Sequence, residues 1–233
     1  MSQTKTPRAV QRSAQIEAIK AVARRLIAEK SVSGLSLREV AREMGLVSSA
    51  LYRYFATRED LLTALILDAY NDLGASVERT DAAFGRTEVY ARWCATAKAV
   101  RRWAKKNPHE YALIYGTPTP GYEAPPETIE AAARVARVLG DILNGGRTTG
   151  DRPQFSTTAS HDVSAYLEVG ALAEVMPGVA PENYVKALMA WTQIFGFLNF
   201  ELFGHYVGTV KNANKMFDRV VDELARSLVI AIP

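Results

Sequence analysis

Only a few side chains in this 233-residue sequence are of types and spacings that could do chemistry. Glu201 and His205 are four residues apart, so on a helix they share one face and could contribute to a metal site. His109 is a further candidate ligand, but it is far away in the sequence, and spacing supplies no third ligand beside the pair. We therefore expect no metal ion and assign these side chains solvated or hydrogen-bonding roles.

Cys94, the one cysteine, is the obvious candidate nucleophile, but it lies in an apolar helical stretch, which favours inert packing. A single cysteine also excludes an intramolecular disulfide framework and a cysteine-rich zinc site. We identify no Ser-His-Asp set, phosphate-binding glycine loop, HExxH motif or paired catalytic carboxylates. The sequence therefore predicts no enzyme and no cofactor.

The charged side chains point to binding instead. The chain has 28 Lys and Arg against 25 Asp and Glu, for a net charge of +3. Residues 1–60 carry 11 of the basic and 6 of the acidic residues, a net of +5, and the remainder has a net of −2. A basic N-terminal quarter suggests a small nucleic-acid-binding module joined to a different kind of domain, with a chance distribution of surface charge as the alternative.

The hydrophobic residues predict a protein without a membrane span. No run approaches 18 uninterrupted apolar residues, and residues 1–12 lack the apolar segment of a secretory signal. With 48% hydrophobic residues, a chain of this length can bury a core without disulfides or metals. We expect a cytoplasmic location.

Apolar residues recur at helical spacing along most of the chain, with no convincing strand and no internal repeat. The sequence therefore predicts an all-α fold, with residues 1–10 disordered or frayed. The expected helices cover residues 8–29, 37–44, 47–55, 57–73, 87–106, 108–115, 127–143, 160–175, 181–203 and 212–230.

Local signals in the N-terminal quarter predict a helix-turn-helix. Ser36 and Glu39 have the spacing of a capping box, as do Thr57 and Asp60. Gly45 can adopt the left-handed conformation that ends a helix. Two short helices on either side of a tight glycine turn are typical of this DNA-binding motif.

Residues 34–62 resemble the DNA-binding domain of the TetR family of bacterial repressors. The most specific match is Leu51-Tyr52-x-Tyr54-Phe55-x-x-Arg58-x-x-Leu61, with Ala41-x-x-Met44-Gly45 at the expected distance upstream. The resemblance covers about residues 10–75. In one departure, Val47 stands where the family often has Ser or Thr as the cap of the recognition helix, and Ser48 could cap one residue later.

The rest of the chain is similar to one C-terminal type in this family, whose signature is Trp-x-x-x-His-Gly followed by Leu-Glu-Leu. Here Trp191-x-x-x-Phe195-Gly196 and Phe200-Glu201-Leu202 stand in its place, so Phe195 replaces the histidine. Residues 101–103 and 116–122 also look like that group. The resemblance implies a DNA-binding domain at 1–60, a connecting helix at 57–73, and a ligand-binding and dimerisation domain at 74–233.

The resemblance also implies which residues bind DNA. The recognition helix would enter the major groove and present Ser48, Ser49, Tyr52 and Arg53. Backbone contacts would come from Tyr52, Tyr54 and Arg58 at the family positions, and from Ser36 at a helix N-terminus.

Other residues near this motif have different expected roles. Lys5, Arg8 and Arg12 could form a flexible basic arm, and Phe55 should pack in the core. Arg38 and Arg42 are expected to be solvated or paired with Glu39 and Glu43.

For the C-terminal domain, the resemblance implies a set of dimer-interface residues and a set of ligand-binding residues. Helices 181–203 and 212–230 would form a four-helix bundle with a second copy, unless they pack only within one subunit. The expected dimer residues are Trp191, Leu202, Met216, Phe217, Val220 and Leu224. An apolar cavity with a few polar groups would bind a small molecule, although such aromatics can also be simply core. Its expected lining is Trp93, Trp103, Tyr111, Tyr115, Tyr122, Tyr166, Phe197 and Glu201.

The sequence thus predicts a dimeric regulator, most simply a repressor that a small-molecule effector releases from a palindromic operator in double-stranded DNA. Three alternatives stay open: an enzyme, an architectural DNA-binding protein without sequence specificity, and a partner-binding module that has lost DNA binding. Operator specificity separates the second from the prediction, because a specific regulator should prefer its site by at least ~10³.

Overall fold

A computed structural model describes residues 6–145, 163–165 and 167–228 of the chain. Their regular structure is helical, with no strand among them, which confirms the all-α fold class. The chain forms two compact units. The first unit contains Met1–Ala69 and Asn107–Thr128, and the second contains Tyr70–Lys106 and Ile129–Pro233.

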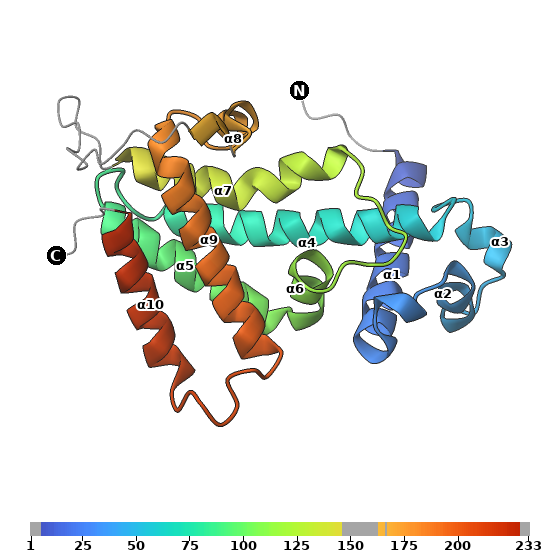
Figure 1. The fold of residues 1–233 in the computed structure, drawn as a ribbon. Coiled ribbons are helices and arrows are strands. Elements are labelled where there is room, and N and C mark those ends of the chain that lie inside the picture. The colour runs from blue at the N-terminus through green and yellow to red at the C-terminus, as the bar shows by residue number, and fades with distance from the viewer. Residues whose placement is uncertain (1–5, 146–162, 166, 229–233) are drawn as a thin grey trace. The chain divides into compact units, whose positions relative to one another are not determined.

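The first unit is built from five helices and a short turn (Figure 1). They are α1 (Pro7–Lys30), the 3-10 turn η1 (Val32–Gly34), α2 (Leu37–Glu43), α3 (Ser48–Leu51), the first half of α4 (Arg58–Asp81) and α6 (Pro108–Tyr115). Helix α1 starts earlier than predicted, because Thr6 caps it and Pro7 occupies its first position. The expectation of a frayed segment up to residue 10 was therefore wrong from residue 6 onward.

Helix α6 belongs to this unit although the second half of α4 and all of α5 separate it in the sequence from the other helices. The core contains buried residues of α1, α2, α3 and α4, among them Ile19, Val40, Leu51 and Leu65. Leu113 of α6 packs against the same core. The compact units therefore differ from the predicted domains, which left residues 107–128 with the C-terminal part.

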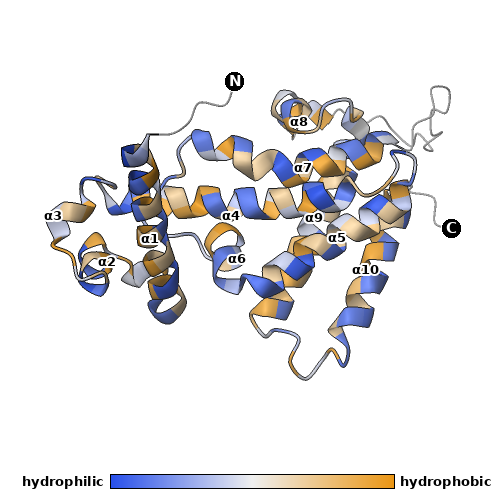
Figure 2. Cartoon of the chain, turned by 180° about the vertical axis from the view of Figure 1, so that it is seen from behind, coloured by the Kyte–Doolittle hydropathy of each residue, from blue (hydrophilic) through white to orange (hydrophobic). Residues whose placement is uncertain are grey.

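The second unit contains the rest of α4 together with α5, α7, α8, α9 and α10. Their bounds are α5 Val89–Lys106, α7 Glu127–Gly145, the 3-10 turn η2 Val163–Ala165, α8 Val169–Val175, α9 Pro181–Leu202 and α10 Ala213–Ser227. Helices α5, α9 and α10 pack against one another. Hydrophilic and hydrophobic residues alternate along α7 and α10 in Figure 2, as expected for helices with one buried face.

Two further predicted helices are interrupted or shorter in the structure. Within the residues described, the segment expected as one helix over 160–175 contains η2 and α8, and the backbone of Glu168 before α8 is neither helical nor extended (φ −76°, ψ 78°). The helix expected over 47–55 ends as α3 at Leu51 and continues as turns.

Helix α4 continues through Gly74, where the predicted connecting helix stopped. A Cβ atom at this position would lie 2.8 Å from the Cβ of Arg134 on α7. Glycine therefore permits a close approach of the two helices, and Arg134 Nε donates to Glu78 of α4 across it (2.7 Å). No helix in the described part of the chain is long and apolar enough to span a membrane.

Candidate functional site

The turn between α2 and α3 is set by backbone hydrogen bonds. The amide of Gly45 donates to the carbonyl of Arg42 (3.1 Å), and that of Leu46 donates to the carbonyl of Ala41 (2.9 Å). These two hydrogen bonds form a Schellman motif, which requires the positive φ of 65° at Gly45. The predicted glycine turn is therefore confirmed, and it fixes where α3 follows α2.

The two predicted capping boxes differ in their second half. At α4, Thr57 Oγ1 accepts from the amide of Asp60 and the carboxylate of Asp60 accepts from the amide of Thr57, both at 3.0 Å. At α2, Ser36 Oγ accepts from the amide of Glu39 (3.2 Å). The Glu39 carboxylate pairs with Lys30 and with Arg42 (3.2 Å), so Arg42 is engaged in a surface ion pair, as expected.

Helix α3 is anchored by one side chain and presents the others. Leu51 is completely buried, and its carbonyl accepts from the amides of Tyr54 (2.8 Å) and Phe55 (3.0 Å), which closes the turn after the helix. Val47 occupies the N-cap position and its side chain makes no cap hydrogen bond. Ser48 is the first residue of α3, so the alternative that it caps the helix was wrong.

The structure brings the predicted DNA-binding residues of this segment to one exposed stretch. Ser49, Tyr52 and Arg53 are exposed, and Ser48 and Tyr54 are half-buried. Four of them offer hydroxyl groups that can donate or accept, and Arg53 offers five N–H donors. Ser36 is half-buried, and its hydroxyl is already used at the amide of Glu39.

Helix α1 adds cationic side chains beside this stretch. The guanidinium of Arg12 lies over the ring of Tyr54, 5.3 Å from its centroid, and Arg12 Nη1 donates to the carbonyl of Arg53 (3.5 Å). Arg8 and Arg12 are both part of α1, so the expectation of a flexible arm was wrong for them. Lys5 lies outside the described residues.

Arg58 has a structural role that the sequence analysis missed. Its Nε donates to the carbonyl of Leu35 (2.8 Å) and its Nη2 donates to the carbonyl of Val32 (2.9 Å). These bonds join the start of α4 to the segment that leads into α2. The predicted phosphate contact at Arg58 stays a prediction, but the side chain is only one-quarter exposed.

Charged side chains connect α1, α4 and α6 inside the first unit. Lys20 is buried and pairs with Asp68 (2.7 Å) and Glu17 (2.6 Å), while Arg24 pairs with Asp68 and with Glu110 (3.9 Å). Burial alone would lower the pKa of Lys20, but the hydrogen bonds to Asp68 and Glu17 outweigh it and hold the pKa above its usual value. This cluster ties α6 to the unit that contains the helix-turn-helix.

The structure does not gather the predicted ligand-binding residues into one described site. Tyr111, Tyr115 and Tyr122 belong to the first unit. Trp93, Trp103, Phe197 and Glu201 belong to the second unit, and Tyr166 lies outside the described residues. The prediction grouped them because aromatic residues mark pockets and cores alike.

Several of these residues are engaged in internal packing. Trp93 Nε1 donates to the carbonyl of Val221 (2.8 Å), and Trp103 Nε1 donates to Asp72 Oδ2 (2.7 Å). The hydroxyl of Tyr122 is hydrogen-bonded to Thr63 Oγ1 (2.9 Å). The ring of Phe197 lies 5.1 Å from that of Phe217. These contacts favour the alternative that the aromatics are core.

Glu201 is paired with two cationic side chains of α5. Arg101 Nε donates to Glu201 Oε2 (2.8 Å) and Lys105 Nζ lies 3.2 Å from Oε1. The hydrogen bond from Arg101 holds the pKa of Glu201 below its usual value, although burial opposes it. His205 is exposed beside the ring of Phe200. The described residues contain no group of three or more side chains suited to bind a metal ion.

Two of the predicted dimer residues were wrongly expected on the surface. Phe217 is 0% exposed and Leu224 is 3% exposed, because α10 packs them against its neighbours in the second unit. Met216 is 41% exposed, whereas Trp191, Leu202 and Val220 are half-buried. The sequence analysis missed the exposed apolar side chains Met189, Phe200 and Phe203 on and after α9.

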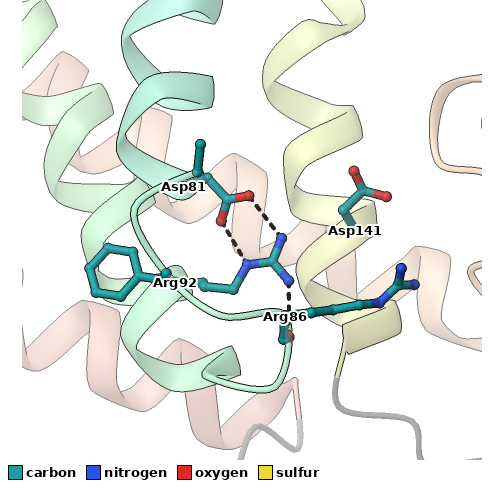
Figure 3. A pocket seen from close by; sticks show the side chains of 6 residues that line it. Asp81, Arg86, Arg92 and Asp141 are labelled. Carbon is teal, nitrogen blue, oxygen red and sulfur yellow. Dashed lines mark hydrogen bonds and ion pairs between the residues drawn. The ribbon is translucent and has the colours of Figure 1, made fainter.

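A polar pocket lies in the second unit and is lined by residues that the sequence analysis did not select (Figure 3). It has a volume of about 220 Å³, and the side chains that define it are Asp81, Arg86, Arg92 and Asp141, with Ala82 and Phe84. The buried Arg92 donates to both carboxylate oxygens of Asp81, each at 2.8 Å, and to the carbonyl of Arg86 at 3.2 Å. This pairing raises the pKa of Arg92 and makes the pocket wall an internal ion pair.

Two buried polar atoms of the second unit lack a partner in the described part of the chain. They are Oγ1 of Thr96 on α5 and Oδ1 of Asn199 on α9. A buried polar atom without a hydrogen bond costs about 1–3 kcal/mol, so such atoms are candidates for ligand anchors. Their residue types alone gave no signal, since threonine and asparagine are also common on helix surfaces.

Two family models match the chain. The model described as "Bacterial regulatory proteins, tetR family" matches residues 19–65, and the model described as "Tetracyclin repressor-like, C-terminal domain" matches residues 93–224. The HTH-type transcriptional regulator Rv1816 of Mycobacterium tuberculosis is 39% identical over 199 residues, which is 82% of each chain. The regulator Mb1846 of Mycobacterium bovis matches equally well.

Solved structures have the same fold. SCO4313, a candidate regulatory protein, is 31% identical, with a TM-score of 0.77 over 94% of this chain and 98% of that chain. A protein of unknown function from Rhodococcus sp. RHA1 is 25% identical, with a TM-score of 0.62 over 91% of this chain and 92% of that chain. The similarity therefore extends over both units.

Proposed function

Because the chain belongs to the TetR family of DNA-binding transcriptional regulators, which are not enzymes, we propose that it is a dimeric repressor that a small molecule releases from a palindromic operator. Dimers and small-molecule effectors are typical of this family. The observation that carries the proposal is the exposure of Ser49, Tyr52 and Arg53, which follow a turn held by the backbone hydrogen bonds of Gly45 and Leu46.

The DNA-binding part of the proposal rests on groups that the first unit leaves accessible. Ser49, Tyr52 and Arg53 can reach base edges or phosphates when α3 lies in the major groove. Arg12, beside Tyr54, is placed to add a phosphate contact. With three to four cationic contacts in each half of a dimer, log affinity against log salt should have a slope of about −5 to −7.

The dimer part rests on exposed apolar side chains of the second unit. Met189 and Phe200 lie on α9, Phe203 directly after it, and Met216 on α10, each at least 41% exposed. Large apolar groups gathered on two helices are a common sign of a protein interface. A second copy would cover them, and its symmetry would place two α3 segments on the two half-sites of a palindrome.

The effector part rests on the second unit and on how the chain connects. Thr96 and Asn199 offer unpaired buried polar atoms that a ligand could satisfy. The chain leaves the second unit after α5, forms α6 on the core of the first unit, and returns through α7. A shift of α5 or α7 on ligand binding would be transmitted to α6 through these covalent links, with a coupling typically of ~1–3 kcal/mol.

Selection of bound fragments from random and genomic duplexes tests the proposal. The full-length protein should select a palindrome whose half-site centres are one helical turn, or a multiple of it, apart. Sedimentation of the complex should give two chains, or a multiple of two, on each site. A selected site without two-fold symmetry, or a monomer on DNA, would contradict the dimer.

The selected duplex then serves to find the effector. Small molecules that release the protein should bind free protein more tightly than operator-bound protein, because a ligand shifts an equilibrium only by its differential affinity. A ligand that binds both forms equally would contradict induction. Equal affinity for selected and scrambled duplexes would favour the architectural alternative.

A further inference from the structure

The side chain at the start of α3 is apolar and points into solvent. Val47 is 72% exposed, and the preceding Leu46 is also exposed. Val47 is the N-cap residue of α3, in extended backbone geometry. It therefore stands directly before Ser48 and Ser49, at the N-terminal end of the segment that presents the predicted DNA-binding groups.

Valine is an unfavourable choice at this position for the protein alone. The helices α1, α2 and α4 of the same unit are capped by the hydroxyls of Thr6, Ser36 and Thr57. Val47 cannot accept a hydrogen bond from the α3 amides, and an aliphatic cap in place of serine or threonine is destabilising. Val47 thus combines an exposed isopropyl group with a missing cap at the residue directly before the predicted DNA-binding serines.

The major groove contains one apolar group that such a side chain can match. It is the C5 methyl of thymine, the one methyl group among base edges that otherwise present mainly hydrogen-bond donors and acceptors. The N-terminal residues of a recognition helix are those nearest to the base edges. An isopropyl group facing a base edge without a methyl would desolvate polar atoms and return no hydrogen bond.

From this geometry we propose that Val47 reads a thymine methyl group in each half-site of the operator. The proposal rests on the proposed function, since it names the base that one more residue of the same DNA interface recognises. Burial of one methyl corresponds to ~0.8 kcal/mol, so each thymine methyl should contribute about fourfold in affinity.

Replacement of thymine by deoxyuridine tests this contact, because it removes the methyl and leaves the base pairing unchanged. Each thymine of the selected duplex is replaced in turn, and the affinity of full-length protein is measured by fluorescence anisotropy. Wild type should lose about fourfold at one thymine position per half-site. The Val47→Ser variant should bind the thymine and deoxyuridine duplexes equally at that position.

The serine variant also separates recognition from folding. Because serine can cap α3, V47S should be at least as stable to urea as wild type while it loses the discrimination. The matched control is Val207→Ser, at a valine that is 84% exposed in the second unit, and it should keep the fourfold difference.

The outcomes distinguish this inference from the function on which it rests. If wild type selects an operator but binds thymine and deoxyuridine equally everywhere, or if V47S keeps the discrimination, the assignment of Val47 is overturned and the DNA-binding proposal stands. If no duplex is selected above scrambled competitor, both fail together.

Discussion

The two units of this protein use their polar side chains in opposite ways. Around α3 in the first unit, backbone bonds and Arg58 hold the turn and the start of α4, and the polar side chains of Ser49, Tyr52 and Arg53 are exposed. In the second unit, the indole N–H groups of Trp93 and Trp103 donate hydrogen bonds to other residues of the same unit. Exposed polar side chains that make no internal hydrogen bonds indicate a binding surface. Aromatic residues on helices indicate a buried region, but they do not show whether a ligand is bound there.

Removal of Arg58 should have the largest effect, because it would disrupt the scaffold rather than a contact. Arg58→Ala loses two charge-assisted bonds to the carbonyls of Val32 and Leu35, and should lower the free energy of urea unfolding by about 2–3 kcal/mol as well as abolish operator binding. Arg53→Ala, at an exposed residue, should weaken DNA binding and leave stability unchanged. If R58A kept wild-type stability, Arg58 would be a DNA contact only.

Trp93 tests whether the second unit uses its aromatics for packing. Trp93→Phe removes the indole hydrogen bond to the carbonyl of Val221 in α10, which should cost about 1 kcal/mol in urea unfolding. Operator affinity in the absence of effector should change little, since the residue belongs to the second unit. Unchanged stability together with weaker effector binding, measured by calorimetry, would show instead that Trp93 lines a ligand site.

The ion pair between Glu201 and Arg101 should make the stability of the second unit depend on pH in the acidic range. The pKa of Glu201 is below its usual value of 4.5 because Arg101 stabilises the carboxylate. A lowered pKa in the folded state contributes stability that is present above about pH 4.5 and is lost as the pH falls through the folded value. Urea unfolding from pH 7 to pH 3 should show a smaller loss for Glu201→Gln than for wild type. Parallel curves would mean that Glu201 is not held by this pair.

Thr96 should give the smallest effect, and one of opposite sign. Thr96→Val replaces a buried hydroxyl that has no partner among the described residues by a methyl of the same shape, and should raise the stability of the free protein by up to about 1 kcal/mol. The same change should weaken the effector if this hydroxyl anchors it. A loss of stability would show that the hydroxyl already has a partner in the protein.

The sequence predicted the local features of the fold better than the tertiary ones. The glycine turn at Gly45, the box at Thr57 and the bounds of α6 follow from residue types a few positions apart. The packing of Leu113 on the core of the first unit depends on contacts between distant residues, so the place of α6 could not be predicted.

The same distinction holds for the candidate site. The exposed residues of α3 were predicted because a specific motif places them, whereas the ligand residues were chosen by type alone and fall in two units. Phe217 and Leu224 were expected at the surface because an amphipathic pattern shows which face of a helix is apolar, but not whether a neighbour in the same chain or a second copy covers it.

Equilibrium titration of the full-length protein, without effector, against its selected duplex and a scrambled duplex of equal length tests the central claim most directly. If the stretch from Ser48 to Tyr54 reads base edges, the selected duplex should bind at least ~10³ more tightly at moderate salt, and the Ser49→Ala, Arg53→Ala double variant should lose most of that ratio. Equal affinity for the two duplexes would contradict the account.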